Sequence, residues 1–297
     1  MQGRILRTDL ACERCKASSP SQKTEYKEER IGLIEKSTLD IKDECASKEN
    51  CIPIGSYTTL YFPALQDAED EVLSELTHVL SEVIKEYLKK ALGGKEIRDA
   101  CILVAGLGNR FMTSDSIGPH VIDKVLATNH IAKQDKKTFT RYFHARTVTL
   151  ATGVMSQTGI ESAELVSAAC KQISPDAVII IDALASRSCQ RLASTIQITD
   201  AGISPGSGIG NTRSAINKEV VGCPTIAIGV PTVVESSTLV YDALEQAGFD
   251  DIPSKLLEVI REDSFFVSPK DSDLVAENAS RVISGALNMV LNESVYK

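Results

Sequence analysis

Hydrophobic residues recur along this chain in two patterns, short solid runs and longer runs at helical spacing. The solid runs are rich in Val, Ile, Leu and Ala and show little polar alternation, which is typical of strands buried on both faces. They cover residues 100–106, 145–150, 177–184, 195–199 and 225–232. The helical runs lie between them, at residues 118–128, 160–173, 236–247 and 271–291. We therefore predict an α/β fold, a three-layer α/β/α sandwich with a mostly parallel or mixed central sheet.

The most regular helical pattern precedes the first solid run. From Asp67 onward, apolar residues recur at helical spacing, acidic residues stand at the start, lysines follow at the end, and Gly93 and Gly94 close the run. Acids at the beginning and bases at the end of a helix complement its dipole, and glycine is the usual residue after its last turn. This stretch is predicted to be an amphipathic helix.

The first 66 residues differ from the rest. They are rich in polar residues and have no regular hydrophobic pattern, apart from a charged run at 23–30 and two strand-like stretches at 30–36 and 56–63. We expect a small strand-rich N-terminal flank, residues 1–66, packed on an α/β core of residues 67–297. No repeat or low-complexity linker divides the chain, so one structural domain overall is expected.

Composition and charge exclude several classes of function. The formal net charge is −8 and the pI is about 5.2, which argues against direct nucleic-acid binding through a basic surface. No apolar run approaches the roughly 20 residues needed to cross a bilayer, and the N-terminus lacks the apolar core of a secretory signal. We therefore expect a cytoplasmic protein that makes no membrane contact.

Eight cysteines raise the question of disulfides or a structural zinc site. Cys12 and Cys15 form a CxxC motif, but Cys45 and Cys51 are spaced too widely for an ordinary zinc ribbon. Thiols stay reduced in a cytoplasm, so small thiol side chains without a metal are the favoured interpretation.

Two aspartates stand where an open α/β sheet places its functional site, beyond the carboxyl ends of strands. Asp115 lies in the turn after residues 100–106, and Asp182 directly follows the apolar residues 177–181. If the two carboxyl groups share one site, repulsion leaves one ionised as a base and the other protonated as an acid, a pair that can activate water for amide hydrolysis. Two alternatives stay open: both aspartates cap turns, or they hold a divalent metal with a third ligand such as His120.

Two glycine-rich stretches accompany these aspartates. Residues 106–119 lack both GxGxxG and the GK[ST] of a P-loop, and residues 204–213 could form either an anion-binding nest or a plain turn, so nucleotide binding is disfavoured. Backbone N–H groups near Gly108 and Asn109 are expected to stabilise a substrate oxygen as its charge develops. Thr113, Asn211 and Arg213 are further candidates for substrate binding, with Arg213 binding an acidic group or forming only a surface ion pair.

Eight motifs in order along the chain resemble the germination protease of endospore-forming bacteria. They are RTDLA at 7–11, GLGN at 106–109, TSDSIGP at 113–119, GVMSQTGIE at 153–161, IDALASRS at 181–188, TIQITDAGISPGSGIGNTR at 195–213, IAIGVPTVV at 226–234 and VSPK at 267–270. The resemblance runs nearly from end to end.

The resemblance implies an endopeptidase that starts the degradation of small acid-soluble spore proteins, the DNA-coating proteins of the dormant spore, when germination begins. It also implies a cytoplasmic homotetramer in the spore core, made as a zymogen, without a cofactor, on the fold of the hydrogenase-maturation endopeptidases. The catalytic aspartates of the family correspond by position to Asp115 and Asp182, the pair that the strand ends indicate.

The chain departs from the family pattern in two places. Only six residues precede Arg7, so we expect a short or missing leader and any self-cleavage before Arg7. The region between residues 248 and 265 is compact where longer relatives carry an insertion. The hydrogenase-maturation relatives bind metal with two acids and a histidine, but no histidine follows His144 here, so a metal site would need an earlier one such as His120.

Overall fold

The computed structural model describes residues 8–14, 24–206, 213–248 and 265–292. Within these residues the strands are β1 (Thr24–Ile31), β2 (Ile34–Ile41), β3 (Gly55–Tyr61), β4 (Cys101–Leu107), β5 (Arg146–Gly153), β6 (Ala177–Ser186), β7 (Thr195–Thr199), β8 (Thr225–Glu235) and β9 (Phe266–Val267). The helices are α1 (Ala11–Arg14), α2 (Glu44–Asn50), α3 (Asp70–Leu92), α4 (Ile117–Lys124), α5 (Asn129–Gln134), α6 (Lys136–Tyr142), α7 (Met155–Thr158), α8 (Ser162–Ile173), α9 (Lys218–Val221), α10 (Ser236–Gln246) and α12 (Ser272–Leu291).

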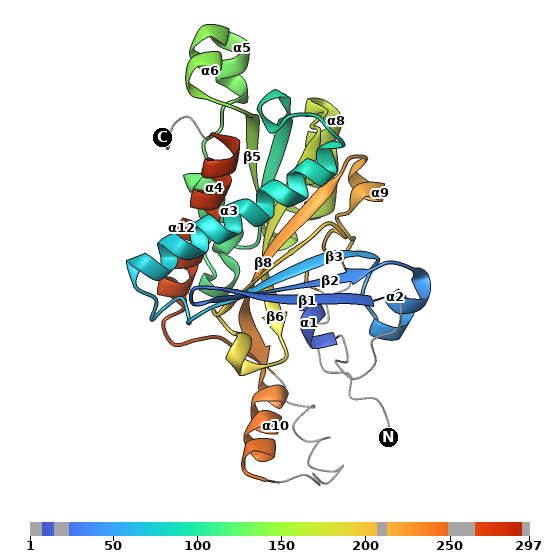
Figure 1. Cartoon of the computed structure of the whole chain (residues 1–297), viewed down its shortest axis with the longest axis vertical. Coiled ribbons are helices and arrows are strands. Elements are labelled where there is room, and N and C mark those ends of the chain that lie inside the picture. Colours follow the sequence, from blue (N-terminus) through green and yellow to red (C-terminus); the bar gives the residue numbers. More distant parts are fainter. Residues whose placement is uncertain (1–7, 15–23, 207–212, 249–264, 293–297) are drawn as a thin grey trace.

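All these strands belong to one mixed sheet. Its order is β1-β2-β3-β7-β8-β6-β4-β5, with β9 paired to β8 (Figure 1). The neighbours β8, β6, β4 and β5 are parallel, whereas β7, β3, β2 and β1 continue the sheet as antiparallel strands. The carboxyl ends of β4, β6 and β8 therefore meet at one end of the sheet, where α/β proteins place their functional sites.

Helices cover both faces of this sheet, which confirms the predicted α/β/α sandwich. On one face α3, α4 and α12 pack against residues such as Ile102 and Val104 of β4, and α3 crosses in front of the strands in Figure 1. On the other face α8 and α9 pack against the alternate residues Leu103 and Ala105. The solid apolar run in β4 follows from this arrangement, because successive side chains point to opposite, equally buried faces.

The expected amphipathic helix is α3. It begins at Asp70 rather than Asp67 and ends at Leu92, followed by Gly93 in the left-handed conformation with φ 59°. Its buried residues include Leu76, Leu80 and Ile84, which contact the sheet. The helical spacing thus identified the element and its buried face.

The N-terminal flank extends the same sheet through the pairing of β3 with β7. The strand expected at residues 30–36 is wrong, because this stretch is the end of a hairpin: β1 ends at Ile31, Gly32 turns with φ 55°, and β2 begins at Ile34. Residues 24–31, which include most of the charged run, form β1, the outermost strand on this side. Charged side chains suit such an edge, since they discourage pairing with another chain.

Other expectations can be compared with the described residues. Within them, each helix is too short or too polar to traverse a lipid bilayer. Cys45 and Cys51 are exposed, Cys12 is half-buried, and all three are free thiols. Cys15, the other half of the CxxC motif, lies outside the described residues.

Close backbone contact joins the end of β4 to the start of α4. A Cβ atom added to Gly118 would lie 2.2 Å from the carbonyl oxygen of Leu107, so only glycine fits there. The turn between these two elements carries Asp115. The close contact of Gly118 with Leu107 therefore fixes the position of the turn between β4 and α4.

We expect Gly118→Ala to lower the free energy of unfolding by about 1–3 kcal/mol, because the added methyl group must push α4 away from backbone atoms. Gly285→Ala is the matched control, since Gly285 also lies in a helix and its Cβ would meet only the Thr77 side chain, at 3.1 Å. The control should change stability by less than about 1 kcal/mol. Denaturant unfolding measures both variants, and equal effects would contradict the account of the β4–α4 contact.

Candidate active site

Asp182 is a buried carboxyl group inside a strand of the central sheet. Its residue is 6% exposed, and β6 continues beyond it to Ser186, so the expectation that it ends a strand is wrong. Its Oδ1 accepts a hydrogen bond of 2.9 Å from the N–H of Ala183. Burial, followed by the negative charges of Asp115 and Asp9, raises the pKa of Asp182 well above its ordinary value.

Asp115 is held by the turn that follows β4. Gly108 has φ 106°, and a Cβ atom there would lie 2.1 Å from the Asp115 carbonyl oxygen, so the turn requires glycine. The N–H of Asn109 donates to Asp115 Oδ2 at 2.9 Å. From β8, the Thr232 hydroxyl donates to the carbonyl oxygen of Ser114 at 2.6 Å and ties the turn to the sheet.

The two aspartates line one cavity of about 220 Å³. Other residues around it come from the turn after β4, the ends of β6 and β8, and the segments near positions 9 and 205, and they include Asp9, Gly108, Ser114, Leu184, Pro205, Arg213 and Thr232. The expected meeting of Asp115 and Asp182 is thus what the structure shows. It arises because β4 and β6 are neighbouring parallel strands.

Asp115 and Asp182 have different surroundings, which act differently on the pKa values of their carboxyl groups. Burial raises the pKa of Asp115 too, but the Asn109 N–H and the positive charge of Arg213 act to lower it. The Ala183 N–H and Arg213 likewise act to lower the pKa of Asp182, but Asp182 is more deeply buried and has two acidic neighbours. At neutral pH this arrangement favours a proton on Asp182 and negative charge on Asp115, a general acid beside a general base.

The remaining predicted residues are placed as follows. Gly108 and Arg213 line the cavity. The backbone N–H of Asn109 donates to Asp115, and the Asn109 side-chain oxygen accepts from Gln157 Nε2 at 2.9 Å. That the Asn109 N–H donates to a substrate oxygen therefore stays a prediction. Thr113 is exposed and does not line the cavity, and Asn211 lies outside the described residues.

His120, the candidate metal ligand, does not line the cavity either. It lies on α4 near the carboxyl groups of Asp123 and Glu277. Within the described ranges, no three His, Cys, Asp or Glu side chains gather in a way that could hold a metal ion.

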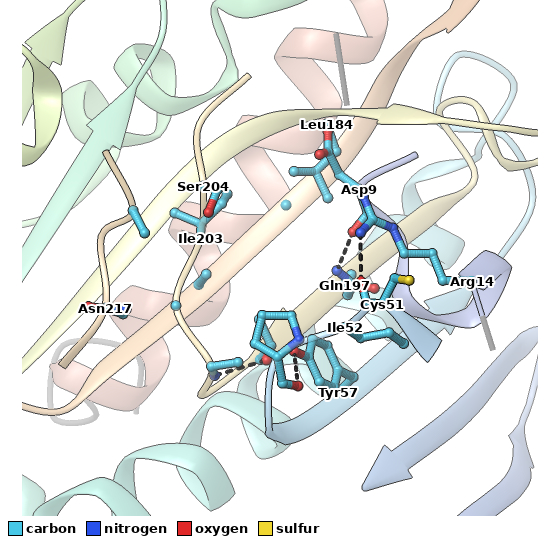
Figure 2. A pocket seen from close by; sticks show the side chains of 17 residues that line it. Asp9, Arg14, Cys51, Ile52, Tyr57, Leu184, Gln197, Ile203, Ser204 and Asn217 are labelled. Atoms are coloured by element: carbon cyan, nitrogen blue, oxygen red, sulfur yellow. Dashed lines mark hydrogen bonds between the residues drawn. The ribbon is translucent and has the colours of Figure 1, made fainter. Parts of the chain in front are cut away.

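Sequence reasoning missed Asp9 as a member of the site. Asp9 belongs to the RTDLA motif and lines the cavity together with the two predicted aspartates. It also lines a second, neighbouring cavity of about 350 Å³, shown in Figure 2, and Leu184 is the other residue common to both. The only sequence signal was its place in that motif.

Comparisons with known proteins agree with the motifs. A family model described as germination protease matches residues 6–247. A germination protease of Caldanaerobacter subterraneus subsp. tengcongensis is 34% identical over 96% of this chain and 94% of its own length. One of Clostridium perfringens is 33% identical over 98% of this chain and 96% of its own length. Among solved structures, a nickel–iron hydrogenase maturation protease of Thermococcus kodakarensis matches 68% of this chain and 98% of its own, with 17% identity and a TM-score of 0.36.

The raised pKa of Asp182 predicts that this carboxyl group destabilises the folded chain at neutral pH. The pKa of Asp182 is higher in the folded state than in the unfolded state. The contribution of Asp182 to the free energy of unfolding is therefore highest below about pH 4, where the group is protonated in both states, and it falls as pH rises toward the folded-state pKa. Asp182→Asn should therefore raise the free energy of unfolding at pH 7 by on the order of 1–2 kcal/mol and change it little at acid pH.

Asp176→Asn is the control with the opposite sign. Although burial acts to raise it, the pKa of Asp176 is lowered by Lys95 and by the N–H of Cys101, so this carboxylate stabilises the fold near neutral pH. Its replacement should lower the free energy of unfolding at pH 7. Unfolding curves of both variants at pH 4 and 7 check the pair, and a destabilised Asp182→Asn at pH 7 would be incompatible with a strained buried acid.

Proposed function

Because this chain belongs to the germination protease family, we propose that it is an endopeptidase that begins the degradation of small acid-soluble spore proteins during germination, using Asp115 and Asp182 to activate water. The family assignment rests on the matched model and on relatives that are at least 33% identical over nearly the whole chain. The observation that carries the mechanism is the pair of carboxyl groups in one cavity, Asp182 buried and Asp115 half-buried, with unequal surroundings.

The proposed reaction uses one proton on the pair. Asp115, as carboxylate, removes a proton from a water molecule, and the water oxygen attacks the carbonyl carbon of the scissile amide while Asp182 donates its proton to the carbonyl oxygen. The tetrahedral diol then collapses as the proton on Asp115 passes to the amide nitrogen and Asp182 takes back a hydroxyl proton. The C–N bond breaks, and both aspartates return to their starting states.

Arg213 is proposed to assist at the same cavity. Its guanidinium acts to lower the pKa of both aspartates and can bind a carboxylate or a developing negative charge on the substrate. The N–H of Gly108, at the cavity wall, is the proposed donor to the substrate oxygen.

The expected setting follows from the family resemblance. We propose a homotetramer in the cytoplasm of the spore core, made as a zymogen, that contacts spore proteins and not nucleic acid or membrane. The acidic net charge of −8 supports a protein substrate over direct DNA binding. Size-exclusion chromatography with light scattering tests the assembly, and a monomer at cellular concentrations would contradict it.

Asp115→Asn and Asp182→Asn should each lower kcat on a small acid-soluble spore protein by about a thousandfold or more, because each removes a proton-transfer group that the other cannot replace. Both variants should remain folded. Activity should be insensitive to a metal chelator, whereas loss of wild-type activity with chelator would favour a metallopeptidase. Near wild-type turnover in either variant would contradict the two-carboxylate mechanism, and no cleavage by the wild type would favour a non-catalytic binding protein.

Arg213→Ala should reduce turnover and move the acid limb of the pH profile to higher pH, because removal of the positive charge raises the pKa of Asp115, which must be ionised. Arg213→Lys keeps the charge and should leave the acid limb near its wild-type position. Steady-state kinetics between pH 4 and 8 compare the two. Identical acid limbs in the wild type and Arg213→Ala would remove Arg213 from the electrostatics of the site.

A further inference from the structure

Two cysteines that are far apart in the sequence meet on the face of the sheet covered by α8 and α9. Cys170 lies on α8 and is 5% exposed, whereas Cys223 lies between α9 and β8 and is half-buried. Both belong to the apolar layer between the sheet and these helices, and both are free thiols. Their side chains are hydrogen-bonded to each other. The two sulfur atoms therefore need only a short movement to form a disulfide bond.

Backbone contacts on both sides hold this pair of cysteines together. Three residues before each cysteine, the Ser167 hydroxyl of α8 donates to the carbonyl oxygen of Val220 at 3.4 Å, so α9 packs beside α8 (Figure 1). Directly after Cys223, the carbonyl oxygen of Pro224 accepts a hydrogen bond of 2.9 Å from the N–H of Val178 in β6. The packing of α8, α9 and β6 thus brings the two thiols into contact.

The two thiols differ in reactivity. The hydrogen bond between them lowers the pKa of Cys223, and the same bond together with burial raises the pKa of Cys170. Cys223 is also the more exposed of the two. Because the thiolate is the attacking species in thiol–disulfide exchange, Cys223 is placed to react with a reagent from solvent. The buried Cys170 can then react with Cys223.

We propose that Cys170 and Cys223 form a redox-active dithiol site whose substrate is a low-molecular-weight disulfide such as oxidised glutathione. The Cys223 thiolate, which has released its proton to solvent, attacks one sulfur of the reagent and expels a thiolate that takes up a proton. Cys170 then attacks the Cys223 sulfur, and its proton passes to the second thiolate that leaves. One external disulfide is reduced to two thiols, and the protein gains one disulfide bond.

This bond would fasten the segment that carries Arg213 on the wall of the active-site cavity. Residues 213–217 lead from that cavity into α9, which is four residues long. At the start of the segment, the N–H of Ser214 donates to Glu161 Oε2 at 3.3 Å, just before α8. A disulfide between Cys170 and Cys223 adds a covalent link to α8 at the other end. Oxidation therefore restrains the segment without a change at either catalytic aspartate.

The first test exposes the protein to mixtures of reduced and oxidised glutathione and locates the products by peptide mass spectrometry. Exposed Cys45 is the internal control, since it is expected to form only a mixed disulfide with glutathione. Ring closure within the protein profits from the high effective concentration of the second thiol. The Cys170–Cys223 link should therefore form at ratios of oxidised to reduced glutathione at least about tenfold lower than those that modify Cys45. Absence of the link, or its formation only where Cys45 is modified, would overturn the proposal.

Two serine variants test the order of the steps. Cys170→Ser should retain glutathione on Cys223, because the second thiol that would displace it is missing. Cys223→Ser should leave Cys170 unmodified, because that thiol is buried. Glutathione on Cys170, or none on Cys223 in Cys170→Ser, would contradict the assigned roles.

Hydrogen exchange measures the restraint on the segment and does not depend on peptide cleavage. The N–H groups of Val221 and Gly222 donate to the carbonyl oxygens of Asn217 and Lys218 within α9. In the oxidised wild type these amides should exchange at least about tenfold more slowly than in the reduced protein. The same treatment should leave their exchange unchanged in Cys170→Ser. Unchanged exchange in a wild-type protein that carries the disulfide would overturn its role as a restraint.

Discussion

Burial of the Asp182 carboxyl group within the central sheet is the constraint on which the rest of the site depends. A carboxylate at this position would lose most of its hydration and face the charges of two other acids. Ionisation there is costly, so the group retains its proton at pH values where exposed aspartates have lost theirs. The neighbouring Asp115, supported by a backbone N–H and by Arg213, can carry the negative charge instead.

The fold supplies this environment through a few specific contacts. Parallel pairing of β4 with β6 brings the turn of Asp115 alongside Asp182. Glycines at 108 and 118 let that turn and α4 approach the backbone closely, and Thr232 fastens the turn to β8. The N-terminal segment then adds Asp9 from the side of β7. The site is thus built from segments that are distant in sequence and rigidly joined by the sheet.

Local patterns in the sequence were enough to predict the sandwich, helix α3 and the main strands, because hydrophobic periodicity reports burial within a single element. The pair of aspartates was also predicted, from the carboxyl ends of neighbouring parallel strands, although Asp182 lies within β6 rather than at its end. The hairpin at Gly32 and the charged strand β1 were not, because an edge strand needs no apolar pattern. Nor was the contact of Asp9 with Ala185, which joins residues 176 positions apart through a pairing that no local pattern encodes.

Neutron diffraction from deuterated crystals at neutral pH would test the central claim most directly, since it locates the proton on the aspartate pair. The account predicts deuterium on the Asp182 carboxyl group, an ionised Asp115, and an ordered water molecule within hydrogen-bonding distance of Asp115. A deuteron on Asp115 with an ionised Asp182, or two ionised carboxylates, would contradict the assignment of acid and base and with it the proposed reaction.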